Sequence, residues 1–271
     1  MCGQYAIVSS IEKIEKKFRL KPNEHLNFKT NVIVSPGLQG LVITNEEPKM
    51  LQSFKFGFTP SWSKKQTYVI NARAEGDRNK DNDPNYTGAK GIISKPFFKK
   101  AIRKQRCLVI ADCFLEGTIK EKLKKPYLVY LRNDEKPFAF AGVWDRWSNK
   151  ETGEIVDNFA IITAPPNKLM LKIPHNRMPV ILPQESHSRY LSESVPLSDI
   201  TPILNQFPPQ LMNAYPVSPD YKEHKEDAAK ALQPTGQRLE KEYEYKIHNK
   251  IKLFGMGESP SREKSDLKKN K

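Results

Sequence analysis

Short apolar segments separated by turn residues fill the first two thirds of the chain, and they constrain the fold more than any other feature. Strand-like runs follow one another without long intervening helices, which argues against a parallel doubly wound sheet. The predicted strands cover residues 31–35, 40–44, 53–58, 68–71, 107–111, 127–131, 138–144, 159–163 and 179–182. The pattern predicts an α+β domain around a strongly curved, mainly antiparallel sheet or barrel with short flanking helices.

Helical signals are few and short. Residues 9–20 give the clearest one, because Ser9 and Glu12 have the spacing of a capping box and apolar residues then recur on one face. Residues 96–104 predict a basic helix leading into the strand at 107–111. Further short helices are predicted at residues 168–171, 184–191 and 197–206.

The composition changes near Lys222, where the chain becomes rich in lysine, glutamate and glutamine. Such segments lack the apolar side chains that a packed core requires. We therefore expect two parts: a folded domain over residues 1–222, and a charged, partly flexible extension over residues 223–271.

The charge and the cysteine count narrow the setting. A net charge of +14 suits a polyanionic partner such as nucleic acid better than an acidic or neutral metabolite. The three cysteines match neither a zinc site nor a disulfide framework, so no metal or other cofactor is expected. With no signal core and no apolar run long enough to cross a bilayer, the sequence predicts a cytoplasmic, monomeric protein, nucleoid-associated if bacterial.

The second residue, Cys2, offers unusual chemistry if Met1 is removed. It would then carry a free α-amine beside a thiol. The pKa of such an amine is about 8, so a useful fraction of it is neutral and nucleophilic near neutral pH. This pair can attack a carbonyl through sulfur, or condense with an aldehyde to close a thiazolidine ring. A cysteine that merely begins a strand is the ordinary alternative.

Polar residues also interrupt the apolar segments at two strand ends. Asn71 and Arg73 are two positions apart, so they share one face of a strand. Glu116 follows the most apolar strand among aromatic and aliphatic neighbours, an environment that raises a carboxyl pKa toward acid/base work. The structural alternatives are that Asn71 caps a turn and that Glu116 lies on the surface.

Two further polar or aromatic positions lie in proline-rich loops. His175 and Arg177 fall between Pro174 and Pro179, and Trp62 follows a glycine- and proline-containing turn. A histidine in such a loop is often only a hydrogen-bonded structural residue.

Taken together and in order, these segments resemble one family. The chain is similar to the SRAP family, the SOS response-associated peptidases now regarded as abasic-site processing proteins. The resemblance covers residues 1–222 and rests on the segments 1–3, 35–37, 57–62, 71–75, 107–116 and 175–179, with 214–218 resembling the closing strand.

The resemblance implies a covalent reaction with the ring-opened aldehyde of an abasic site in single-stranded DNA. Cys2 would form a thiazolidine crosslink, Asn71 would position it and the sugar, Glu116 would move protons, and His175 would assist ring opening and reversal. An aldehyde independently needs an amine, an acid and a thiolate for this chemistry, and three of these residues supply them.

The resemblance also implies a DNA-binding surface. Arg73 and Arg177 would contact phosphates, and Trp62 would stack on an unpaired base. Family members usually carry arginine at the position of Gln4, so one expected DNA contact is missing here or is supplied elsewhere. The peptidase name implies removal of Met1, and strand cleavage by a lyase step is an associated possibility.

Two other classes of function remain open. Met-Cys-Gly also begins the N-terminal-nucleophile glutamine amidotransferases, although no glutamine-binding motif or ammonia-using domain is evident. A non-enzymatic basic DNA-binding adaptor would account for the charge but not for the polar segments.

Overall fold

The structure is a computed structural model that describes residues 3–132 and 136–242. The chain divides into a compact unit, Met1–Leu239, and a second unit, Glu240–Lys271. The first unit thus continues beyond the boundary predicted at Lys222. Most of the second unit lies outside the described residues, so the prediction of a partly flexible extension is not tested.

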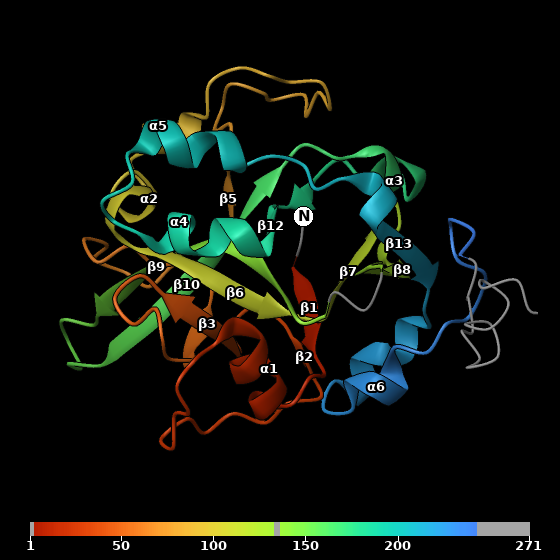
Figure 1. Ribbon diagram of the computed structural model, residues 1–271, viewed down its shortest axis with the longest axis horizontal. Helices are drawn as coiled ribbons and strands as arrows, with labels where there is room; N and C mark the ends of the chain where they lie inside the picture. Colours follow the sequence, from red (N-terminus) through yellow and green to blue (C-terminus); the bar gives the residue numbers. More distant parts are fainter. Residues whose placement is uncertain (1–2, 133–135, 243–271) are drawn as a thin grey trace, which may run out of the picture. The chain divides into compact units, whose positions relative to one another are not determined.

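The described residues form two sheets, and the larger one closes into a barrel (Figure 1). Its strands are β3 (Gln39–Thr44), β4 (Gln52–Phe56), β5 (Asn71–Arg73), β6 (Arg106–Ala111), β9 (Phe138–Ser148), β10 (Ile155–Ala164), β11 (Met178–Pro179) and β12 (Ile181–Leu182). Because β9 pairs with both β6 and β10, the strands β10, β4, β3, β6 and β9 form a closed ring. Among the strand pairings of the described residues, those of β10 with β4 and β5 are parallel and the others are antiparallel. The predicted α+β fold with a curved, mainly antiparallel sheet is confirmed.

The second sheet has the strand order β13-β8-β7-β1-β2. Its strands are β1 (Gln4–Ile7), β2 (Val32–Val34), β7 (Cys113–Thr118), β8 (Lys122–Leu131) and β13 (Met212–Pro216). The sequence pattern missed β1 and β7 as separate strands. Strand β7 follows β6 after the single residue Asp112, so one apolar run supplies both sheets.

Asp112 forms the corner between the two sheets. Its buried carboxylate accepts hydrogen bonds from the backbone N–H groups of Val8 and Ser9 and from the Ser9 hydroxyl, at 2.6–2.7 Å. Ser9 is therefore not the helix cap that the sequence predicted. Ser10 is the N-cap instead, because its hydroxyl accepts from the backbone N–H of Lys13.

The helices are short and lie outside the strands. They are α1 (Ile11–Phe18), α2 (Ala101–Lys104), α3 (Lys168–Lys172), α4 (His187–Leu191), α5 (Leu197–Ile200) and α6 (Ala228–Ala231), with 3-10 turns η1 (Gly91–Ile93), η2 (Gln184–Ser186), η3 (Thr201–Ile203), η4 (Pro209–Leu211) and η5 (Pro219–His224). The predicted helix at residues 96–104 is reduced to α2, and the one at 197–206 is divided into α5 and η3. Pro196 and Pro202 explain the latter, since proline favours the start of a helix and not its interior.

Tyr5 joins β1 to the barrel core. Its fully buried ring meets Phe56 and Phe140 edge to face, with centroids 5.7 and 5.9 Å apart. A Cβ at Gly40 would lie 2.2 Å from the Tyr5 hydroxyl, so only glycine leaves room for this ring. Replacing such a ring by alanine costs about 3–5 kcal/mol. The packing therefore holds the beginning of the chain against the barrel.

Candidate active site

The site begins with the pairing of β1 to β7. Gln4 is opposite Leu115 in this antiparallel register. Because the two strands run in opposite directions, a step from Gln4 toward the start of the chain corresponds on β7 to a step from Leu115 to Glu116. Cys2, the residue expected to react, lies outside the described residues, and so does Met1.

Glu116 and His175 form a buried pair. The Oε2 atom of Glu116 lies 3.2 Å from Nε2 of His175, and their side chains are 3% and 9% exposed. Glu116 comes from β7, whereas His175 comes from the loop between α3 and β11. The pair thus bridges the two sheets. Sequence reasoning singled out both residues but gave no basis for pairing them.

The other nitrogen of the imidazole fixes the position of the proton. Nδ1 of His175 is 2.7 Å from the carbonyl oxygen of Gly117, which can only accept a hydrogen bond. Nδ1 therefore carries a proton, and Nε2 of the neutral ring is an acceptor facing Glu116. A proton on the Glu116 carboxyl satisfies this arrangement.

Burial favours the same neutral form of the pair. It raises the pKa of Glu116 to about 7, and it lowers the pKa of His175 to about 4. A carboxyl group with a pKa near neutrality can both give and take a proton at physiological pH. The pair is therefore suited to general acid/base chemistry.

Asn71 and Arg73 lie on β5, which is parallel to β10. They flank the buried Ala72, as expected for two side chains on one face of a strand. The Asn71 amide donates to the Ile70 carbonyl at 3.0 Å. The guanidinium of Arg73 donates to the Asn82 side chain at 2.9 Å, and the Arg73 side chain remains 33% exposed. Arg73 is thus held in place while still reaching solvent.

Arg177 is held far more completely. Its side chain is 3% exposed, and its guanidinium donates to both carboxylate oxygens of the fully buried Glu75. It also donates to the backbone carbonyl and the hydroxyl of Thr163, each at 2.8 Å. Arg73 approaches the same carboxylate at 3.7 Å, so Glu75 brings the two arginines together at the end of β10. The predicted phosphate contact of Arg177 is not tested, but its burial points to a supporting role.

Trp62 lies on the surface of the protein. It is 59% exposed and packs edge to face on Phe97, with ring centroids 5.9 Å apart. The neighbouring Ser61 hydroxyl accepts a hydrogen bond from Lys100 at 3.2 Å. An exposed indole beside a cation is suited to an unpaired base and its phosphate.

A buried hydrogen-bonded chain supports the first strand. The amide of Gln4 donates to the Ser35 hydroxyl at 2.9 Å, and the Gln4 carbonyl accepts a hydrogen bond from the hydroxyl of Tyr221. Burial, together with the charge of Glu116, raises the pKa of Tyr221 to about 12. Gln4 therefore serves as an internal link in this chain, a role that the sequence did not indicate.

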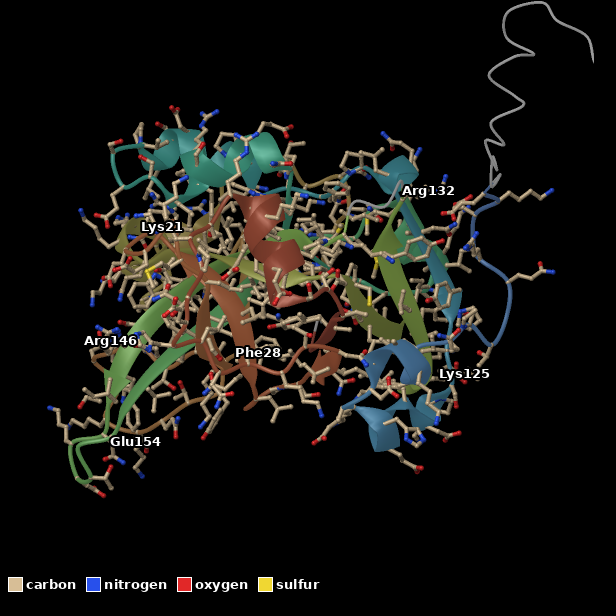
Figure 2. All side chains as sticks on the ribbon, turned by 60° about the horizontal axis from the view of Figure 1, so that its bottom comes forward. Lys21, Phe28, Lys125, Arg132, Arg146 and Glu154 are labelled. Carbon is tan, nitrogen blue, oxygen red and sulfur yellow. The ribbon has the colours of Figure 1, made fainter. Side chains whose placement is uncertain are left out.

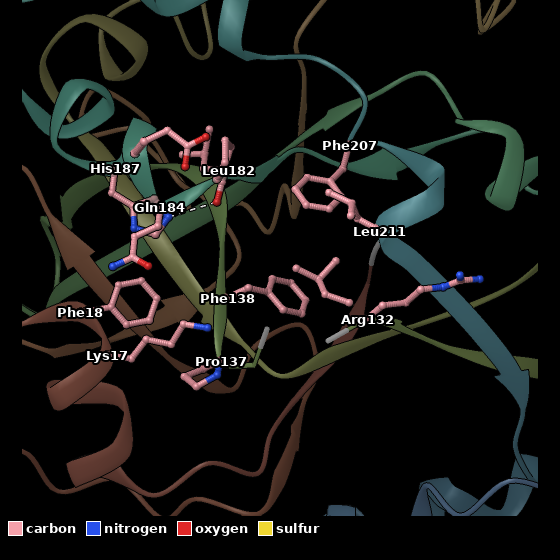
Figure 3. Close-up of a pocket in the computed structure, with 13 residues that line it drawn as sticks. Lys17, Phe18, Arg132, Pro137, Phe138, Leu182, Gln184, His187, Phe207 and Leu211 are labelled. Carbon is pink, nitrogen blue, oxygen red and sulfur yellow. Dashed lines mark hydrogen bonds between the residues drawn. The ribbon is translucent and has the colours of Figure 1, made fainter. Parts of the chain in front are cut away.

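The cavity drawn in Figure 3 is separate from these residues. It has a volume of about 360 Å³ and is walled mainly by apolar side chains, among them Phe18, Phe138, Leu182, Phe207 and Leu211. None of the predicted site residues lines it. Among the described residues there is no cluster of acidic, histidine or cysteine side chains that could hold a metal ion, and no helix is long and apolar enough to span a membrane.

Comparison with known proteins identifies the family of this chain. Residues 1–223 match the family model described as SOS response associated peptidase (SRAP). The chain belongs to the SRAP family. SRAP relatives include YoqW of Bacillus subtilis, named an abasic site processing protein, which is 30% identical over 226 residues, covering 80% of this chain and 92% of YoqW. The abasic site processing protein HMCES of Xenopus tropicalis is 26% identical over 195 residues, covering 63% of this chain and 53% of that protein.

A solved structure shares the SRAP-like fold. The crystal structure of a protein from Bacteroides thetaiotaomicron superposes on this chain with a TM-score of 0.75 at 25% sequence identity. The superposition covers 87% of this chain and 100% of the other. The architecture described above is therefore that of a known group of structures.

Proposed function

We propose that this protein processes abasic sites in single-stranded DNA by forming a covalent thiazolidine crosslink through Cys2. Its named relatives are abasic site processing proteins. The observation that carries the proposal is the buried pair of Glu116 and His175. Glu116 directly follows Leu115, the residue of β7 that is paired with Gln4.

Covalent geometry limits how far Cys2 can lie from this pair. Consecutive Cα atoms are 3.80 Å apart, so the Cα of Cys2 is within about 7.6 Å of the Cα of Gln4. Gln4 is itself paired with the neighbour of Glu116. A proton donor and a terminal nucleophile are therefore tethered to adjacent strands.

The reaction balances without a cofactor. The Cys2 amine adds to the aldehyde carbon, and Glu116 supplies the proton with which the carbinolamine hydroxyl leaves as water. The thiol of Cys2 then passes its proton to the Glu116 carboxylate, which restores the acid. The resulting thiolate adds to the carbon of the protonated imine, forming the C–S bond that closes the ring and leaving a neutral ring nitrogen. One water is lost in all. In this proposal Asn71 positions the sugar, and His175 exchanges the proton with Glu116 and assists ring opening and reversal.

The surrounding residues divide between contact and support. Arg73 and Trp62 are exposed enough to meet a phosphate and an unpaired base. Arg177 instead organises Glu75 and, through it, Arg73. Removal of Met1 is required to free the amine, and this cleavage accounts for the peptidase name. A lyase step by β-elimination from the imine would compete with ring closure.

Intact mass spectrometry tests the proposal. The protein incubated with an abasic single-stranded oligonucleotide should gain the mass of the oligonucleotide less one water. Cys2→Ala should form no stable adduct, and Cys2→Ser should give only an imine that borohydride traps. Retained Met1 in protein that crosslinks, or a stable adduct of Cys2→Ala, would refute it. Release of ammonia from glutamine would favour the amidotransferase alternative instead.

A further inference from the structure

A strongly basic hairpin adjoins the acid/base pair. Residues 118–125, here called the lysine hairpin, comprise the end of β7, the turn 119–121 and the beginning of β8. Four of its residues are exposed lysines, namely Lys120, Lys122, Lys124 and Lys125. Its one acidic residue, Glu121, is paired with Lys125 at 2.6 Å. The hairpin therefore presents an excess of positive charge.

The lysine hairpin is built onto the loop that carries His175. The backbone N–H of Ile119 donates to the carbonyl of Pro174 at 3.0 Å, and Gly117 accepts the hydrogen bond of the imidazole. A Cβ at Gly117 would lie 1.7 Å from the carbonyl oxygen of Lys122, so this glycine is needed to close the hairpin. The lysines are thereby fixed within a few residues of Glu116.

Exposed apolar groups accompany the charge. Ile119 is 56% exposed, and Leu171 at the end of α3 is 47% exposed. Lys172 is the next residue after Leu171 and is also exposed. Cations interleaved with apolar side chains fit a single strand, which offers phosphates together with uncovered sugar and base faces.

We propose that the lysine hairpin binds the phosphates of one arm of the single-stranded DNA that flanks the abasic site. The inference rests on the proposed function, since it supposes a lesion at Glu116 and His175. Arg73 belongs to the barrel sheet, whereas the hairpin belongs to the five-stranded sheet. The two arms of the strand thus leave the lesion over different sheets.

The test compares two variants of equal charge. The first combines Lys120→Gln, Lys122→Gln and Lys124→Gln. The control combines Lys13→Gln, Lys16→Gln and Lys21→Gln, which lie on and after α1. Figure 2 shows Lys21 and Lys125 on opposite sides of the first unit. All six lysines are exposed, so neither change disturbs the core.

Binding to a lesion-free single strand is measured first, as a function of salt. Each phosphate neutralised on a single strand contributes about 0.7 to the slope of log affinity against log salt. The hairpin variant should lower that slope by about 2, which is three such contacts. The control should leave it nearly unchanged. Equal slopes for the two variants would overturn the inference.

Oligonucleotides with nucleotides on one side of the abasic site then test which side of the lesion the lysine hairpin binds. One carries nucleotides only 5′ of the abasic site, and the other only 3′ of it. The hairpin variant should lose affinity for one of them and match the control on the other. Equal losses on both, or a loss on neither, would contradict the assignment of one arm to the hairpin. Failure of the proposed function would appear separately, as no crosslink with wild-type protein on either oligonucleotide.

Discussion

The buried pairs Glu116–His175 and Glu75–Arg177 differ in what burial does to their charge. An arginine guanidinium stays protonated in proteins, so Arg177 is a permanent cationic partner for the Glu75 carboxylate. An imidazole can lose its proton, and burial drives the Glu116–His175 pair toward its neutral form. In the proposed function, the basic partner thus decides whether a buried carboxyl group serves as a structural ion pair (the scaffold) or as a proton donor (the reagent).

The largest expected effect concerns the reagent pair. Glu116→Gln keeps the size of the side chain but removes the transferable proton, so crosslinking should slow by about 10² to 10⁴ fold. Single-turnover rates at saturating abasic DNA measure this. Affinity for lesion-free DNA should remain unchanged. An equal fall in affinity and rate would assign Glu116 to structure and erase the contrast with Glu75.

The scaffold pair should respond in stability. Arg177→Met leaves the Glu75 carboxylate buried without its main partner, which costs about 3–5 kcal/mol of unfolding free energy. Denaturant unfolding measures the loss. The double variant Glu75→Gln/Arg177→Met is the control and should recover part of it. If Arg177→Met unfolds at the wild-type denaturant concentration, the pair is not a scaffold.

The two pairs should also differ in pH dependence. The pKa of Glu116 is about 7 in the folded protein against an ordinary 4.5, so only the folded chain holds this proton between those values. Its contribution to stability is therefore present below pH 4.5 and is lost as the pH rises through 7. At pH 8, the free energy of unfolding of Glu116→Gln should exceed that of the wild type by on the order of 1 to 3 kcal/mol.

This gain should shrink at pH 5, where wild-type Glu116 is still protonated. His175 acts in the opposite direction, since its lowered pKa removes stability as the pH falls toward 4. At pH 8, far above the His175 pKa of about 4, this contribution does not enter the comparison. Unfolding curves at both pH values provide the measurement, and a gain that is equal at pH 5 and pH 8 would argue against a raised Glu116 pKa.

The smallest effect is expected at the neutral network of Gln4. Tyr221→Phe removes the hydroxyl that donates to Gln4, at a cost of about 1 kcal/mol. Loosening the first strand should slow crosslinking a few fold, because Gln4 is paired with the residue next to Glu116. Ser35→Ala provides a matched control at the other end of the chain. An unaltered crosslinking rate would limit Tyr221 to packing.

The sequence predicted the fold class and most strands because their apolar patterns are local. It missed β7 because residues 106–118 form an almost continuous apolar run, and only the tertiary contacts of Asp112 divide it between two sheets. The same contacts moved the helix cap from Ser9 to Ser10.

For the candidate site, residue type could suggest Glu116 and His175 separately, but their contact depends on how the sheets meet. The burial of Arg177 could not be predicted from the sequence either, since its partner Glu75 lies 102 residues earlier in the chain. Tyr221 gave no signal because a single tyrosine near a proline has no distinguishing pattern.

The hydrogen bond from His175 to Gly117 also makes the site observable by spectroscopy. The two ring nitrogens of a neutral imidazole have well-separated ¹⁵N chemical shifts, and the carbonyl of Gly117 determines which nitrogen is protonated. Gly117 also closes the lysine hairpin. A DNA strand that moved the hairpin would therefore change the balance between the two tautomers of His175. The ¹⁵N resonances of His175 would thus report in a single spectrum on the proposed DNA binding at the lysine hairpin and on the proton of the buried pair.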